Sequence, residues 1–140
     1  MTQKELDAAM LRLNSERTVK MNDINRKRDE ARLEMEKRVG AVQMQTAAKR
    51  NEIYTHIEML RKEMLKLDKD SKAHEEKTEE TRRQENRIRR LKDQEAVETI
   101  KIRDNARAYL LQMDYEARRV SQWFIDEKAR LAREYVECRM

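Results

Sequence analysis

The sequence contains no proline and a single glycine, Gly40, among its 140 residues. Turns and phosphate-binding loops depend on these two residue types, because glycine reaches positive φ angles and proline fixes φ. Their scarcity argues against a compact fold with many short connections.

Cysteine and long apolar runs are also scarce. Cys138 is the only cysteine, so no disulfide can form within the chain. No apolar run approaches the roughly 18 residues that a membrane span needs, and the N-terminus lacks the hydrophobic region of a signal peptide. We therefore expect a soluble, cytoplasmic protein, or one packaged into a particle after cytoplasmic synthesis.

Charged residues dominate what remains, at 44% of the chain against 4% aromatic residues. This composition, combined with helical periodicity, is typical of coiled coils and long helices. Disorder is the alternative, because low hydrophobicity and high charge also favour an unfolded chain. The signs are mixed, with 33 Lys and Arg against 28 Asp and Glu, and the net charge of +5 is modest. An ordered helical chain is the better interpretation.

Apolar residues recur at steps of three and four from Leu6 onward, after a capping-box pair formed by Thr2 and Glu5. A longer period of eleven residues runs through both halves of the chain. Its members are Leu13, Ile24, Met35, Thr46 and Ile57 in the first half, and Ile102, Met113, Phe124 and Tyr135 in the second. Eleven residues in three turns is about 3.67 per turn, so the apolar seam runs nearly straight. The pattern predicts an all-α, coiled-coil-like chain with hendecad-like periodicity.

The polar stretch between Leu67 and Ile88 divides this pattern, because its only apolar residue is Ala73. We predict one long amphipathic helix over residues 1–68 and a polar linker or turn over 69–79. A second long helix follows over 80–140, with an apolar docking segment at 106–136. Neither helix can close a globular core alone, so each must bury its apolar stripe on another helix. An antiparallel hairpin and an oligomeric helical bundle both satisfy this requirement.

A hairpin that turns near Lys72–His74 pairs positions whose numbers sum to about 146, since short connections make antiparallel neighbours. The apolar residues of 53–67 then face residues 79–93, where only Ile88 and Leu91 are apolar. This mismatch leaves two interpretations open. Either the tip of the hairpin binds a partner, or the chain is extended and its apolar segments pair between copies.

Catalytic motifs are absent from the sequence. His56 and His74 lie far from each other and from Cys138, and no C-x-x-C or H-E-x-x-H spacing occurs. A two-helix arrangement also offers little room for a concave active site. We therefore predict a non-enzymatic protein with no catalytic residues, no cofactor and no metal site.

One basic cluster precedes the docking segment. It consists of Arg82, Arg83, Arg87, Arg89, Arg90 and Lys92. Basic helices can follow phosphate backbones, but these side chains point in different directions around a helix, and no aromatic residues interleave with them for base stacking. We favour a solvated helix face, with contact to nucleic acid or to an acidic protein surface as the alternative.

The segment 106–136 is richest in large apolar residues. We predict a partner interface made of Leu110, Met113, Val120, Trp123, Phe124, Leu131 and Tyr135. Phe124 lies on the eleven-residue seam and should be buried in any assembly. Trp123 lies off the seam, so it widens the stripe beyond a two-helix contact, and such aromatic residues often anchor interfaces.

The leading functional hypothesis is a structural or scaffolding coiled-coil subunit. It would act by forming homo-oligomers and by docking to a larger assembly of protein helices. One alternative is a basic helical protein that contacts nucleic acid, for example one packaged with DNA in a virion. The other is a coiled-coil adaptor or stalk that binds one globular partner. Neither a membrane nor a small-molecule substrate is expected as a partner.

Overall fold

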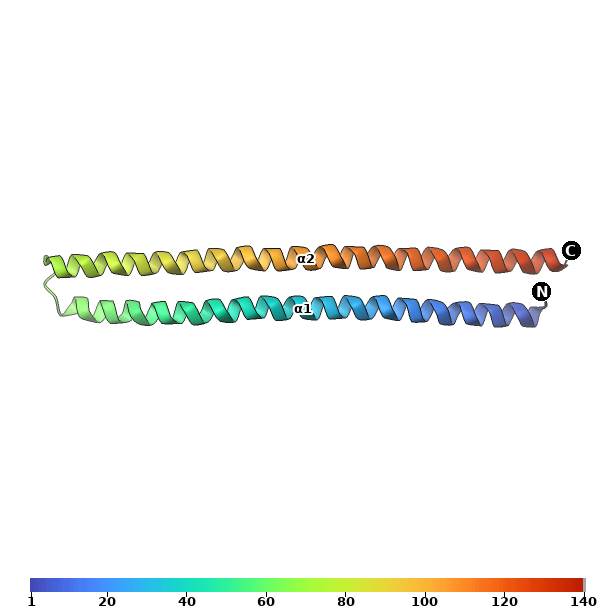
Figure 1. Cartoon of the computed structure of the whole chain (residues 1–140), viewed down its shortest axis with the longest axis horizontal. Coiled ribbons are helices and arrows are strands. Elements are labelled where there is room, and N and C mark those ends of the chain that lie inside the picture. Colours follow the sequence, from blue (N-terminus) through green and yellow to red (C-terminus); the bar gives the residue numbers. More distant parts are fainter. Residues whose placement is uncertain (140) are drawn as a thin grey trace. The chain divides into compact units, whose positions relative to one another are not determined.

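The computed structural model describes residues 1–139, and two helices contain nearly all of them (Figure 1). Helix α1 spans Gln3–Leu65 and helix α2 spans Lys72–Arg139, and a short turn connects them. No strand occurs within residues 1–139. The two helices pack against each other as a hairpin, which confirms the predicted all-α fold with two long helices.

The start of α1 is capped as the sequence predicts. The Glu5 N–H donates to Thr2 Oγ1 at 3.1 Å, and the Leu6 N–H donates to the Thr2 carbonyl at 3.0 Å. Gly40 lies within α1 and has no positive φ, and a Cβ added there would meet nothing within 4 Å. The single glycine therefore leaves the helix uninterrupted.

The start of α2 depends on Ser71. Its Oγ accepts from the His74 N–H at 3.2 Å and donates to the Asp68 carbonyl at 2.6 Å. A serine in this position satisfies one of the N–H groups that the first helical turn leaves without an intrahelical partner. This cap fixes the helix start at Lys72.

The connection is consequently shorter than the linker predicted over 69–79, because residues 72–79 are helical and only 66–71 form the turn. The sequence pattern indicates a helix through apolar periodicity, which residues 72–79 lack. Capping and side-chain contacts replace that periodicity here. Lys77 of α2, for example, forms an ion pair with Glu63 of α1.

The helices pack in two units, each described here by itself. Unit 1 combines Met1–Glu34 with the part of α2 from Asn105 onward, and unit 2 is Met35–Asp104. Each unit contains a segment of both helices, so each has its own interhelical seam.

The seam of unit 1 contains two apolar clusters. One is formed by Leu13, Phe124 and Leu131, and the other by Ile24, Met113 and Ala117. Phe124 is only 9% exposed, as its place on the eleven-residue seam predicts. The buried residues form one narrow line between two helices, so the rest of each helix surface remains outside the core.

The seam of unit 2 centres on Ile53, Ile57 and Ile88, with Leu91 packed against them. Polar residues interrupt this seam, since Thr46, Gln84 and Thr99 are also buried. Towards the turn the apolar packing thins out, and Leu65 is 87% exposed. The predicted apolar mismatch near the tip is therefore present.

Candidate functional site

Three of the seven predicted interface residues are used within the chain. Met113, Phe124 and Leu131 are buried against α1, whereas Leu110, Val120, Trp123 and Tyr135 are partly buried. The side chains that unit 1 can offer to a partner must therefore lie outside the buried seam. Two such surfaces occur on α2, one at its edge with α1 and one facing away.

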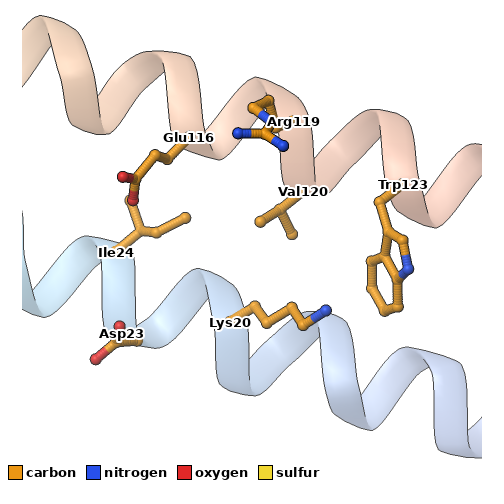
Figure 2. A pocket seen from close by; sticks show the side chains of 7 residues that line it. All are labelled: Lys20, Asp23, Ile24, Glu116, Arg119, Val120 and Trp123. Atoms are coloured by element: carbon orange, nitrogen blue, oxygen red, sulfur yellow. The ribbon is translucent and has the colours of Figure 1, made fainter.

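The first surface is a groove of about 420 Å³ at the edge between the helices of unit 1, referred to below as the Trp123 groove. It is lined by Lys20, Asp23, Ile24, Glu116, Arg119, Val120 and Trp123. Figure 2 shows Lys20 extending from α1 towards the indole of α2, and its Nζ lies 3.7 Å from the ring centroid. This cation–π contact shields one face of the indole.

Charged groups surround the apolar floor of the Trp123 groove. Arg26 and Lys27 contact Asp23 at 2.7 and 3.2 Å, and their hydrogen bonds lower the pKa of that carboxyl group. Asp23 therefore stays ionised at neutral pH. With Glu116 and Arg119 on the other wall, the rim carries both signs of charge, which suits a polar edge around an apolar contact.

The second surface, referred to below as the outer stripe, runs along α2 at alternating steps of four and three residues. Its members are Leu111, Tyr115, Arg118, Gln122, Ile125, Ala129, Ala132 and Val136, and all are exposed. Leu111 lies two residues from buried Met113, which is about 160° around the helix. The outer stripe therefore faces away from α1.

Large apolar side chains in the outer stripe are more exposed than a folded surface usually allows. Leu111 is 62% exposed, Tyr115 60%, Ile125 58% and Val136 54%. Six of the eight stripe positions are apolar, with Arg118 and Gln122 as the two polar members. Spacing of this kind is the heptad pattern of a helix that packs against another helix.

Helix α1 in the same unit exposes apolar residues without such a stripe. Leu11, Val19 and Leu33 are 71%, 69% and 55% exposed. They lie eight and fourteen residues apart, and Asn22 and Asn25 occupy intervening heptad positions counted from Leu11. Scattered apolar residues are normal on protein surfaces, so the outer stripe is a property of α2.

In unit 2 the basic cluster lies at the surface, with all six cations exposed. Arg83 contacts Glu80 at 3.1 Å, and Arg87 donates to Gln84 at 3.0 Å. The other four are Arg82, Arg89, Arg90 and Lys92. None of these four forms an ion pair or hydrogen bond with any residue that the structure describes.

A second groove, of about 450 Å³, adjoins this cluster and is referred to below as the Tyr54 groove. It is lined by Tyr54, Ile57, Glu58 and Arg61 of α1 and by Glu85, Ile88, Arg89 and Lys92 of α2. Tyr54 is 47% exposed, and Arg61 holds Glu85 at 3.6 Å. The fold thus brings an aromatic ring beside two cations of the basic cluster.

Within residues 1–139, no group of three or more His, Cys, Asp or Glu side chains is placed to hold a metal ion. Neither described helix contains a stretch long and apolar enough to cross a membrane. The outer stripe and the two grooves are the surfaces on which a function can be built.

No family model matches the chain, and neither a curated protein nor a solved structure matches it.

Proposed function

We propose that this protein is a non-enzymatic structural subunit that self-associates through the outer stripe of α2. The observation that carries this proposal is the heptad line of large apolar side chains, each more than half exposed, on the face opposite the intrachain seam. Apolar surface left in water is unfavourable by roughly 25 cal/mol per Å². Covering the outer stripe is therefore a source of binding free energy.

The spacing of the outer stripe favours a helix as its occupant. A period of 3.5 residues keeps the stripe facing a partner helix, and each side chain enters a space between four side chains of that partner. The buried seam of the same helix follows the eleven-residue period instead. The two periods separate the contact with α1 from the contact with a partner.

The two polar members of the outer stripe favour a second, antiparallel copy of α2. In a two-fold symmetric pair, each residue meets its counterpart twice, and here positions whose numbers sum to about 240 lie opposite each other. Arg118 then faces Gln122 of the second copy, so each polar side chain meets a polar one. A polar pair inside a helical interface fixes the register.

The same register matches the apolar members. Tyr115 faces Ile125 of the second copy, and Leu111 faces the small side chain of Ala129. At the flank, Asp114 comes near Lys128 of the second copy, which places opposite charges together. Arg119 would meet its own equivalent near the two-fold axis, but its side chain lines the Trp123 groove on the other flank of α2.

Light scattering after size exclusion tests whether the outer stripe causes assembly. We expect the wild-type mass to rise above 17.0 kDa with concentration, and Leu111→Gln with Ile125→Gln to return it towards the monomer. The matched control is Val19→Gln with Leu33→Gln, which removes equally exposed apolar groups from α1 of the same unit. A wild type that remains monomeric, or a control that dissociates as readily as the stripe variant, contradicts the proposal.

Disulfide trapping tests the register. In a Cys138→Ser background, the Arg118→Cys and Gln122→Cys proteins are oxidised separately and as a mixture. The antiparallel register predicts a covalent dimer mainly in the mixture, because position 118 faces position 122. Efficient dimers of either protein alone would indicate a parallel pair. Stable 1:1 capture of a globular protein without any homodimer would favour the adaptor alternative.

A further inference from the structure

The basic cluster and the Tyr54 groove lie outside the proposed self-association surface, so they can serve a separate function. The segment 82–92 contains six cations and one carboxylate, Glu85, which gives it a net charge of +5. The whole chain also has a net charge of +5. The remainder of the chain is therefore neutral, and its excess positive charge is concentrated in about three helical turns of unit 2.

Most of this charge is not neutralised within the fold. Elsewhere on the helices, cations such as Arg26 and Arg130 each contact two carboxylates. In the cluster, Arg82, Arg89 and Arg90 have no such contact among the described residues. Arg82 and Arg89 are seven residues apart, so they share one flank of α2 at a distance of about 10.5 Å along the axis. An unneutralised row of guanidinium groups attracts a polyanion.

The structure adds the aromatic group that the cluster lacks in sequence. Tyr54 is 38 positions away from Lys92 in the chain, yet both line the Tyr54 groove. Arg89 contributes a second cation to the same groove. Glu58 and Glu85 also line it, but Arg61 lies 3.6 Å from Glu85 and offsets its charge. The groove therefore combines a half-exposed ring with two unpaired cations.

We propose that the Tyr54 groove and the adjoining basic cluster bind single-stranded nucleic acid. The cations would contact the phosphate backbone, and the Tyr54 ring would stack on a base. Single strands suit this arrangement because their bases are free to stack on aromatic side chains, whereas the bases of a duplex stack on each other. An acidic protein or an anionic membrane would use the cations without needing the ring.

Fluorescence anisotropy with a labelled oligothymidylate of about 15 nucleotides tests this proposal, since such sites cover roughly 4–16 nucleotides. The cluster variant changes Arg82, Arg89, Arg90 and Lys92 to Gln. The charge-matched control changes Arg12, Lys37, Lys49 and Lys101 to Gln, which are exposed cations outside the cluster. Both variants lower the net charge equally, so only a specific site separates them.

We expect the cluster variant to bind at least tenfold more weakly at low salt, and the control to bind nearly as well as wild type. The salt slope should fall by about 3, because each phosphate contact on a single strand contributes about 0.7. Tyr54→Ala should weaken binding by about tenfold or more, and Tyr54→Phe should retain binding, because the phenyl ring still stacks. Light scattering of each variant should give the wild-type mass, which separates this site from self-association.

Several results would overturn the proposal. Wild-type protein that does not bind the oligonucleotide at low salt has no such site. Equal weakening in the cluster variant and its control would reduce binding to net charge. Tyr54→Ala binding like wild type would remove the stacking contact. Tighter binding to duplex DNA, to heparin or to vesicles of anionic phospholipid would assign the cluster to another polyanion.

Discussion

Replacement of Ile57 by Ala is the sharpest test of the intrachain seam. Ile57 is 3% exposed and packs with Ile53 and Ile88 across unit 2. The substitution removes three carbon atoms, and each buried methylene contributes about 0.8 kcal/mol. Ile-to-Ala changes in enclosed cores cost roughly 2–5 kcal/mol. A two-helix seam can close partly around the missing atoms, so we expect a loss of about 2 kcal/mol.

Urea unfolding followed by circular dichroism measures this loss, and Met59 provides the control. Met59 lies two residues further along α1 and is 56% exposed. Met59→Ala should change the free energy of unfolding by no more than about 0.5 kcal/mol, as exposed substitutions usually do. If Met59→Ala is as destabilising as Ile57→Ala, or if Ile57→Ala has no effect, then Ile57 does not lie in the hairpin seam.

Three further predictions concern local contacts. Ser71→Ala should destabilise the start of α2 by about 1 kcal/mol through loss of the N-cap, and Ser71→Asp should retain it; amide hydrogen exchange in the first turns of α2 measures both. Thr46→Val should raise the melting temperature, because the Thr46 hydroxyl is buried and bonded only to the Val42 carbonyl; a lower melting temperature would reveal a polar partner across the seam. Lys77 lowers the pKa of Glu63 below its ordinary 4.5, so the contact stabilises the tip above that pH and is lost as the pH falls through the lowered pKa. The NMR helical shifts around the turn should follow this loss in wild type and show no such titration in Glu63→Gln.

The helices and their buried seam could be predicted because one signal, the eleven-residue period, specifies both. Ile24, Met113 and Phe124 are members of that period, and each is buried between α1 and α2. The end of the connection could not be placed in the same way. Residues 72–79 lack large apolar side chains, and the Ser71 cap that starts α2 becomes visible only when its hydrogen bond to the His74 N–H is seen.

The candidate surfaces were harder to predict, for two different reasons. The Tyr54 groove joins residues far apart in the chain, although the predicted hairpin register does pair position 54 with position 92. The outer stripe lies within one segment, but it overlaps the buried seam in sequence. Trp123 was expected to need a partner, and the structure shows that Lys20 of α1 already covers part of its ring. A cation on the other helix leaves no signal in apolar periodicity.

The coexistence of two periods on α2 also limits how far a second copy can pair with it. A heptad stripe drifts by about 20° per seven residues around a straight helix. Between Leu111 and Val136 the outer stripe therefore turns by about 70°, while the eleven-residue seam with α1 stays nearly straight. A straight partner helix can follow such a stripe for only three to four heptads before losing contact, unless both helices supercoil, and the packing on α1 opposes supercoiling. Contacts of this length bury less area than the 1,200–2,000 Å² of most stable protein complexes. We therefore expect a concentration-dependent dimer with a Kd in the micromolar range, and sedimentation equilibrium that gives a nanomolar Kd would require a longer interface than the outer stripe.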